Sequence, residues 1–172
     1  ADAEDRSMST LTLVDVGVKY SRRSAFALTG HSDTVVSGEW LGLIGPNGAG
    51  KSSLLKAIVG LVGHTGEILM DGVALSSMSD RERAGRVAYV SQDPLIPDDM
   101  TAREYALLGR TPYIGYFGSP SRRDRTIVDD VLERLRLGEF AHRMMGELSG
   151  GERQRIVLAR ALAQQAPILL LD

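Results

Sequence analysis

Hydrophobic and polar positions along the chain change period several times, from alternation typical of strands to spacing typical of helices. Leu11–Lys19 alternates apolar and polar residues in part, which predicts a strand. Glu39–Ile44 is a short apolar block that predicts a second strand. Lys51–Leu61 places four apolar residues on one stripe, which predicts an amphipathic helix. Alternating strands and helices predict an α/β fold.

Turn signals and further apolar blocks define the middle of the chain. Asp71-Gly72 lies between Glu67–Met70 and Val73–Leu75, and this pair predicts a β hairpin with a two-residue turn. Val87–Val90 predicts a compact strand. Thr111–Pro120 contains two prolines and two glycines and is expected to be a loop.

Three serine or threonine residues precede a glutamate by three positions, which is the spacing of a helix capping box. The three pairs are Ser79 with Glu82, Thr101 with Glu104, and Ser149 with Glu152. Ser121 is expected to cap a further long helix, which Gly138 would end. Pro167 breaks the last helix, and Ile168–Asp172 predicts a buried strand that ends on a carboxylate.

Composition excludes several classes of function. The chain has 172 residues, the length of one domain. Its 20 Lys and Arg nearly balance 22 Asp and Glu, so no nucleic-acid partner is expected. The absence of cysteine excludes disulfides and thiolate chemistry. Apolar runs of at most four residues are too short to cross a bilayer. Residues 1–10 are polar and are expected to form a flexible lead-in.

The segment between the second strand and the first helix fits the phosphate-loop pattern G-x-x-x-x-G-K-S/T. Its residues are Gly45, Pro46, Asn47, Gly48, Ala49, Gly50, Lys51 and Ser52, and Ser53 follows as a further nucleotide-binding candidate. Glycines let successive backbone amides turn toward a phosphate, and the helix start presents its positive end. Lys51 supplies a charge to the β and γ phosphates, and the Ser52 hydroxyl can ligate Mg²⁺. A chance lysine in a glycine-rich turn would lack this strand and helix context.

A second helix start, Leu148-Ser149-Gly150-Gly151-Glu152, lies about a hundred residues further along the chain. Ser149 supplies a capping hydroxyl, and the two glycines leave the helix end bare for an anion. Taken alone, this segment is equally well explained as an ordinary capped helix.

The two motifs together resemble the ATP-binding cassette (ABC) ATPases, in which L-S-G-G-E/Q is the signature motif. The resemblance runs from about Leu11 to Asp172. It implies an α/β P-loop NTPase core sheet with an antiparallel β hairpin region and an inserted helical subdomain. The domain would cover residues 11–172, with the helical subdomain at about 96–150, and the family's C-terminal strands would be missing.

The family resemblance also implies a mechanism. Two copies would pack head to tail as a homodimer, and each ATP would lie between the phosphate loop of one copy and the signature of the other. The residues that serve the nucleotide of the second copy would be Ser149, Gly150, Gly151 and Glu152. The catalytic set would be Lys51, Gln92 and Asp172, with Ser149 acting in trans.

Three further residues are assigned by their place in the family's motif order. Gln92 matches the Q-loop glutamine, which touches Mg²⁺ and the attacking water. Asp172 matches the Walker B aspartate, so Ser52, Gln92 and Asp172 would hold the metal. Tyr20 falls where the family places an aromatic residue that stacks on adenine. The implied cofactors are therefore ATP and Mg²⁺.

The chain departs from the family's pattern after Asp172. The glutamate that polarises water and the switch histidine would follow there, and His31, His64 and His142 all precede that point. These 172 residues alone are therefore expected to hydrolyse ATP weakly or not at all, with apolar surface exposed.

The segment Tyr105–Tyr113 is similar to the L-G-R-x-P-Y/H run of importer ATPases for iron-siderophore, haem and cobalamin. Gly109 would end a helix, Arg110 could cap its carbonyls, and Pro112 would fix the loop. The resemblance implies an ATPase that couples MgATP binding and hydrolysis to import through transmembrane permease subunits. Such a protein would lie peripherally on the cytoplasmic face of the cell membrane.

Two other functions fit the same motifs. The first is a soluble twin-cassette ATPase acting on ribosomes or other complexes, and the second is an ATP-binding module without hydrolysis. The cluster of Arg122, Arg123 and Arg125 predicts either a solvated face or a contact with an acidic partner loop. Trp40 and Met144-Met145 are expected to pack in the core or in the helical subdomain, with no cofactor role.

Overall fold

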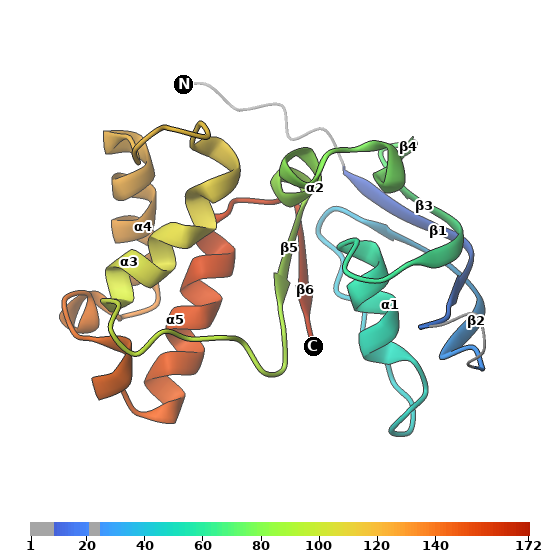
Figure 1. The fold of residues 1–172 in the computed structure, drawn as a ribbon, viewed down its shortest axis with the longest axis horizontal. Helices are drawn as coiled ribbons and strands as arrows, with labels where there is room; N and C mark the ends of the chain where they lie inside the picture. The colour runs from blue at the N-terminus through green and yellow to red at the C-terminus, as the bar shows by residue number, and fades with distance from the viewer. Residues whose placement is uncertain (1–8, 21–24) are drawn as a thin grey trace. The chain divides into compact units, whose positions relative to one another are not determined.

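The computed structural model describes residues 9–20 and 25–172 (Figure 1). The expected flexible lead-in falls almost entirely on residues 1–8, which lie outside this range, and Thr10 already belongs to a strand. The chain divides into two compact units. The first contains the described residues up to Arg86 together with Asp172, and the second is Val87–Leu171.

An antiparallel sheet forms most of the first unit. Its strands are β1 (Thr10–Val18), β2 (Leu28–Val36), β3 (His64–Met70) and β4 (Val73–Ala74), in the spatial order β2-β1-β3-β4. The prediction for β1 is confirmed, and its buried side chains include Leu11, Leu13 and Val16. The sequence pattern did not identify β2, which pairs antiparallel with β1 at one edge of the sheet.

The predicted hairpin joins β3 to β4 through Asp71 and Gly72. Both residues have positive φ, 52° and 78°, as expected for the turn type that matches the twist of a two-residue hairpin. The Asp71 carboxylate also accepts a hydrogen bond of 2.7 Å from the backbone amide of Thr10. The turn is therefore tied to the first residue of β1.

Helix α1 (Lys51–Ile58) begins where the phosphate loop ends and buries Leu54, Leu55 and Ile58. It is three residues shorter than predicted, because Val59 caps it and Gly60 turns the chain with φ 79°. Two short elements follow the hairpin: the 3₁₀ turn η1 (Leu75–Ser77) and helix α2 (Asp80–Arg86). The predicted capping box of Ser79 and Glu82 is confirmed at the start of α2.

The predicted strand at Glu39–Ile44 is wrong, because this segment has irregular backbone. A strand requires a neighbour for its backbone hydrogen bonds, and no described strand pairs with this segment. Trp40 is 96% exposed and Ile44 98% exposed, so the expectation that Trp40 packs in the core is also wrong.

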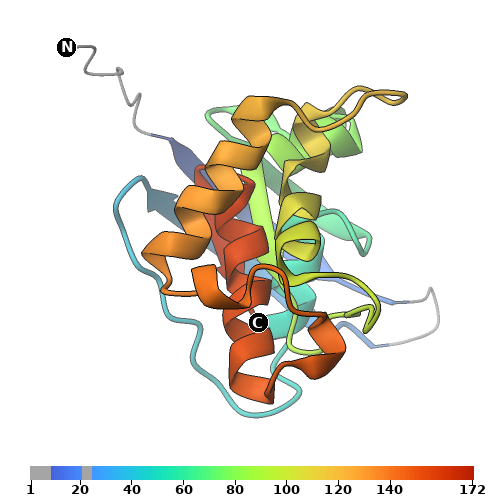
Figure 2. The same cartoon turned by 90° about the vertical axis from the view of Figure 1, so that its left-hand side faces the viewer.

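The helices of the second unit lie on one side of a parallel strand pair, as Figure 2 shows from the side of the helices. The strands are β5 (Val87–Val90), as predicted, and β6 (Ile168–Leu171), which ends one residue before Asp172. The expectation that this last strand is buried is wrong except at Ile168, because Leu169 is 37% and Leu171 54% exposed. The helical elements are α3 (Ala102–Leu107), α4 (Arg122–Arg134) and α5 (Gly150–Ala163), with 3₁₀ turns η2 (Leu108–Tyr113), η3 (Gly138–Phe140) and η4 (Met145–Glu147). Thr111–Tyr113, the first part of the segment expected to be a loop, thus belongs to the 3₁₀ helix η2.

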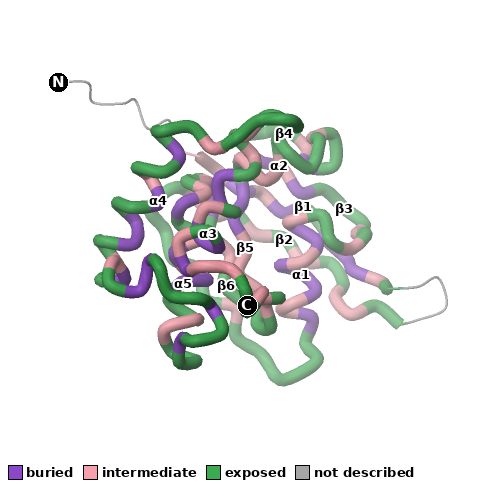
Figure 3. The backbone as a smooth tube through the Cα atoms, turned by 60° about the vertical axis from the view of Figure 1, so that its left-hand side comes forward, coloured by how far each residue is buried: buried purple, intermediate pink, exposed green. Residues whose placement is uncertain are grey.

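The core of the second unit is formed where α3, α4 and α5 meet, and buried positions recur along these helices in Figure 3. Tyr105, Val128, Leu132 and Ile156 are almost fully buried. Met145 is buried as expected, whereas the neighbouring Met144 is 42% exposed. No described helix is long and apolar enough to span a bilayer.

Helix α4 ends differently from the prediction. The left-handed residue after it is Arg136, with φ 55°, and Gly138 instead begins η3. The amide of Leu137 donates to the carbonyl of Leu132 at 2.8 Å, and that of Arg136 donates to Glu133 at 2.9 Å. Burial of Leu137 fixes this Schellman turn, even though a non-glycine residue occupies the left-handed position.

Candidate functional site

The phosphate loop has the conformation that its glycines allow. Gly48 and Gly50 have φ values of 83° and 88°, and α1 starts directly afterwards at Lys51. No side chain caps this helix start, so the amides of its first turn remain directed at the loop. Uncapped amides at the positive end of a helix are suited to an anion.

Gly50 cannot be replaced without rearrangement of its surroundings. A Cβ atom on Gly50 would overlap the backbone carbonyl oxygen of Ala27 and lie 3.1 Å from the Cβ of Leu28. Positive φ and close backbone approach therefore both require glycine here. The strand edge at Leu28 thus fixes where the phosphate loop turns into α1.

The Lys51 side chain folds over the loop that precedes it. Its Nζ donates hydrogen bonds to the carbonyl oxygens of Gly45 at 2.8 Å and Pro46 at 2.9 Å. The ammonium therefore lies among the backbone groups of the predicted phosphate site.

Two of the three predicted metal ligands lie side by side. The Ser52 hydroxyl donates a hydrogen bond of 2.6 Å to the carboxylate of Asp172, although 120 positions separate them in the sequence. Both residues belong to the first unit. Gln92, the third, is an exposed residue of the second unit just after β5.

Tyr20 is anchored to the start of α1 through a contact that the sequence pattern did not reveal. Its hydroxyl shares a hydrogen bond of 2.9 Å with the hydroxyl of Ser53, which is buried. The tyrosine is 58% exposed, so its ring presents a face to solvent. An exposed, tethered ring is suited to stacking on a planar base.

The signature turn is capped as predicted. The backbone amide of Ser149 donates to the Glu152 carboxylate at 2.7 Å, and the amide of Glu152 donates to the Ser149 hydroxyl at 3.4 Å. The Ser149 hydrogen bonds lower the pKa of Glu152 below its usual value. Cβ atoms on Gly150 and Gly151 would meet nothing within 4 Å, so packing within the described chain does not require glycine there.

The Gly109–Tyr113 run holds the opposite end of α5. Arg110 donates to the Asp124 carboxylate at 2.9 Å and to the Ala163 carbonyl at 2.8 Å. Arg110 therefore caps α5, which corrects the expectation that it caps its own helix. The hydroxyl of Tyr113 donates to the carbonyl of Gln164 at 2.8 Å, and its ring lies under the Arg110 guanidinium at 4.0 Å.

Asp124 is the buried carboxylate that forms an ion pair with Arg110. Its carboxylate accepts hydrogen bonds from the Ser121 hydroxyl and from Arg110, and these hold the pKa of Asp124 at about 2 against the opposing effect of burial. Gly109 lies so close to α5 that a Cβ atom would overlap the carbonyl oxygen of Arg160. The glycine thus permits backbone contact between η2 and α5.

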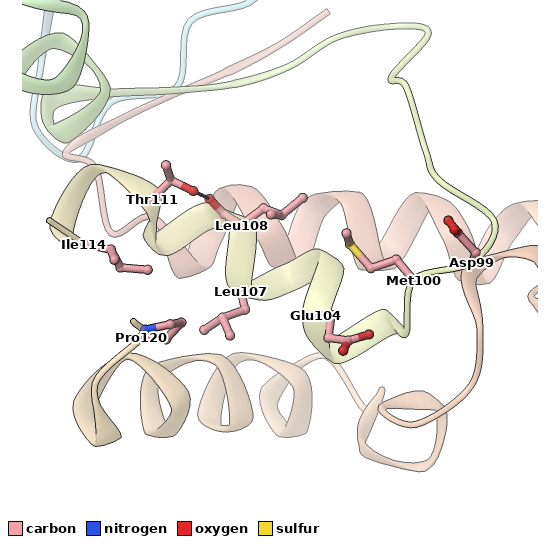
Figure 4. Close-up of a pocket in the computed structure, with 8 residues that line it drawn as sticks. All are labelled: Asp99, Met100, Glu104, Leu107, Leu108, Thr111, Ile114 and Pro120. Carbon is pink, nitrogen blue, oxygen red and sulfur yellow. Dashed lines mark hydrogen bonds between the residues drawn. The ribbon is translucent and has the colours of Figure 1, made fainter. Parts of the chain in front are cut away.

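A cavity of about 400 Å³ opens in the second unit beside α3 and η2 (Figure 4). Five apolar and three polar residues line it: Met100, Leu107, Leu108, Ile114 and Pro120, with Asp99, Glu104 and Thr111. Glu104 also closes the capping box of α3 with Thr101, and those hydrogen bonds lower its pKa. The sequence analysis missed this cavity, because its lining comes from segments that are separate in the pattern.

Comparison with known proteins places these features in a wider group. A family model described as ABC transporter matches residues 28–172. The cobalamin import ATP-binding protein BtuD of Halobacterium salinarum is 43% identical over 140 residues, covering 81% of this chain and 35% of that protein. The iron(3+)-hydroxamate import ATP-binding protein FhuC of Bacillus subtilis is 36% identical over 166 residues, covering 96% of this chain and 61% of that protein.

Similarity extends to solved structures. An inward-facing structure of a metal-chelate type ABC transporter superposes with a TM-score of 0.78 at 28% identity. The match covers 95% of this chain and 60% of that one. The chain therefore spans from 35% to 61% of the length of the proteins compared here.

Proposed function

Because the chain belongs to the ABC transporter family, we propose that it is the ATP-binding part of an ATPase that drives import through a membrane permease. The observation that carries the proposal is the phosphate loop itself. Left-handed Gly48 and Gly50 lead into an uncapped helix start, and the Lys51 ammonium lies over the same loop. Family membership supports ATP as the ligand of this site.

ATP binding would use residues of the first unit. Backbone amides of Gly45–Ser53 would surround the phosphates, and Lys51 would exchange its two carbonyl partners for the β and γ phosphate oxygens. The exposed ring of Tyr20, held through Ser53, would stack on the adenine.

Mg²⁺ fits the pair formed by Ser52 and Asp172. A hydroxyl and a carboxylate 2.6 Å apart provide the oxygen donors that this ion prefers. Bound there, Mg²⁺ would neutralise phosphate charge. We assign Gln92 as the third contributor because of its place after β5.

The signature turn would act on a second copy of the chain. A Cβ atom on either of its two glycines would meet nothing within 4 Å, so packing within the described chain does not require glycine there. We propose a head-to-tail homodimer in which Ser149, Gly150 and Gly151 contact the γ-phosphate held by the partner copy. Hydrolysis would then belong to the assembled pair, because each site needs both copies.

Permease and cargo are proposed from the relatives. The named relatives import cobalamin and iron(3+)-hydroxamate, which supports an iron-chelate, haem or cobalamin cargo for the whole protein. The apolar cavity with Asp99 and Glu104 at its rim is suited to an amphipathic segment of a permease subunit. This arrangement would hold the protein on the cytoplasmic face of the membrane.

The substitution Lys51→Ala tests the nucleotide site. Loss of charge-assisted hydrogen bonds to phosphate is expected to weaken ATP binding by about 100-fold, measured by equilibrium binding of labelled ATP. Lys56→Ala on the same helix is the matched control and should leave the affinity unchanged. Equal affinity in the Lys51→Ala protein and the unsubstituted protein would refute the proposal.

A further inference from the structure

A tight turn in the second unit presents two aromatic side chains to solvent. The amide of Gly118 donates to the carbonyl of Gly115 at 2.8 Å, which places Tyr116 and Phe117 at the central positions of the turn. Tyr116 is 95% exposed and Phe117 97% exposed. Their rings contact each other edge to face, with centroids 5.0 Å apart. Two large side chains are thus exposed to water together.

Three arginines follow this turn at the beginning of α4. Arg122, Arg123 and Arg125 are all exposed, and no ion pair among the described residues engages their guanidinium groups. Cations at the N-terminus of a helix are disfavoured by its dipole. The intervening Asp124 does not neutralise them, since it is buried and paired with Arg110. Local stability therefore gives no reason for this concentration of positive charge.

The turn and the arginines are exposed and lie close together along the chain. Phe117 and Arg122 are five residues apart, so their Cα atoms are separated by at most about 18 Å. Acidic neighbours further along α4 do not cancel the charge at its start: Asp129 is paired with Arg103 at 2.6 Å, and Asp130 lies on the following turn. We call Tyr116, Phe117, Arg122, Arg123 and Arg125 the aromatic–arginine surface.

We propose that the aromatic–arginine surface binds the anionic lipid headgroups of a membrane directly. Tyrosine and phenylalanine are suited to the boundary between headgroups and acyl chains, and arginine pairs readily with phosphate. The turn exposes the two aromatic rings between Gly115 and Gly118, and exposed rings of this kind can insert between lipid headgroups. An acidic protein loop is the competing partner and is an outcome of the test below. This contact goes beyond the proposed function, in which the permease holds the protein at the membrane.

The proposal is tested by co-sedimentation of the nucleotide-free protein with lipid vesicles. Vesicles of equal parts phosphatidylcholine and phosphatidylglycerol should bind it, and vesicles of phosphatidylcholine alone should bind it far more weakly. Arg122→Gln/Arg123→Gln should weaken partitioning onto the anionic vesicles roughly 25-fold, since each surface arginine contributes roughly fivefold. Tyr116→Ser/Phe117→Ser should weaken it at least about tenfold.

The matched control lies at the other end of the same helix. Arg134→Gln/Arg136→Gln removes two exposed charges and should change partitioning by less than about twofold, because specific placement is what the proposal requires. ATP affinity should be unchanged in every variant. Loss of vesicle binding with intact ATP binding is therefore distinguishable from failure of the nucleotide site.

Three results would overturn the proposal. The first is equal binding to both kinds of vesicle, or none to either. The second is an equal loss in the Arg134→Gln/Arg136→Gln control. The third concerns the Arg122→Gln/Arg123→Gln and Tyr116→Ser/Phe117→Ser variants. If they bind vesicles normally but no longer co-purify with detergent-solubilised permease, the surface binds a protein partner.

Discussion

The phosphate loop and the signature turn are both glycine-rich helix starts, but the space around their glycines differs. Gly50 is required by its own surroundings, because the Ala27 carbonyl leaves no room for a side chain. Gly150 and Gly151 face open space. The first glycine is thus explained by the fold of its unit. Packing among the described residues does not require the other two, and the second copy proposed above would account for them.

The two helices are also held at opposite ends. Helix α1 is fixed where it begins, by the close approach at Gly50 and the hydrogen bond between Ser53 and Tyr20. Helix α5 is fixed where it finishes, by Arg110 on the Ala163 carbonyl and Tyr113 on Gln164. The glycine at the start of α1 is therefore enclosed by its unit, whereas the two glycines at the start of α5 have no neighbour within 4 Å of an added Cβ atom. Substitutions at the start of α1 and at the two ends of α5 can test this difference.

Gly50→Ala should give the largest effect. A Cβ atom at positive φ against a backbone carbonyl is expected to destabilise the protein by about 3 kcal/mol or more and to abolish ATP binding. Urea unfolding and equilibrium ATP binding would measure both. Gly38→Ala is the matched control, because φ at Gly38 is 89° but nothing lies within 4 Å. It should cost only about 1 kcal/mol, and equal losses would contradict the role of the Ala27 contact.

Asp124→Asn tests the anchoring of α5 at its far end. Leaving Arg110 without its charged partner should cost about 3 kcal/mol in the free energy of unfolding. The pKa of Asp124 is about 2 in the folded protein, below its value of 3.8 when free. Its contribution is therefore present above about pH 4 and is lost as the pH falls toward 2.

Urea unfolding across this pH range separates the variant from the unsubstituted protein. The difference in stability between them should shrink as the pH falls from 4 to about 2, the folded-state pKa. A pH-independent difference would mean that the ionised carboxylate does not support the end of α5. ATP affinity should remain unchanged in the variant, because the phosphate loop belongs to the other unit.

Ser149→Ala should have a smaller effect on stability. Loss of a capping hydroxyl typically costs about 1 kcal/mol, and ATP binding by the isolated chain should not change. Ser79→Ala is a matched control, since it removes the same kind of exposed serine cap from α2. Both variants should lose similar stability in urea, but only Ser149→Ala should slow hydrolysis by the assembled protein. Equal hydrolysis rates in the two variants would show that Ser149 is only a cap.

Gly151→Ala should have the smallest effect on the fold. Alanine in an exposed helix is favoured over glycine by up to about 1 kcal/mol, so stability should stay the same or rise. Hydrolysis by the assembled protein should nevertheless fall. Gly85→Ala in α2, also with nothing within 4 Å, should match its stability without affecting hydrolysis. A clear loss of stability in Gly151→Ala would remove the contrast between the two helix starts.

Local sequence signals predicted much of the fold and of the site. The Asp71-Gly72 hairpin, the capping boxes and the start of α1 depend on residues within a few positions of one another. The pattern therefore contained what was needed to find them. The contact between Ser52 and Asp172 followed from the family's motif order, which local rules do not supply.

The failures share a different cause. Glu39–Ile44 is apolar enough for a strand, but a strand also needs a partner for its backbone, and none is described. Gly138 was a plausible helix end until burial of Leu137 moved the left-handed turn to Arg136. Arg110 was assigned to its own helix, although its partners lie 14 and 53 positions away. These outcomes depend on neighbours distant in sequence.

The contact between Gly109 and Arg160 has a mechanical consequence. The Gly109 backbone approaches the Arg160 carbonyl so closely that no side chain fits between them, so no rotamer change can absorb a displacement at this point. Strain applied to the segment around Pro112 would consequently move the signature helix as part of a rigid body. The smallest residue of the Gly109–Tyr113 run thus permits a direct backbone contact with the signature helix.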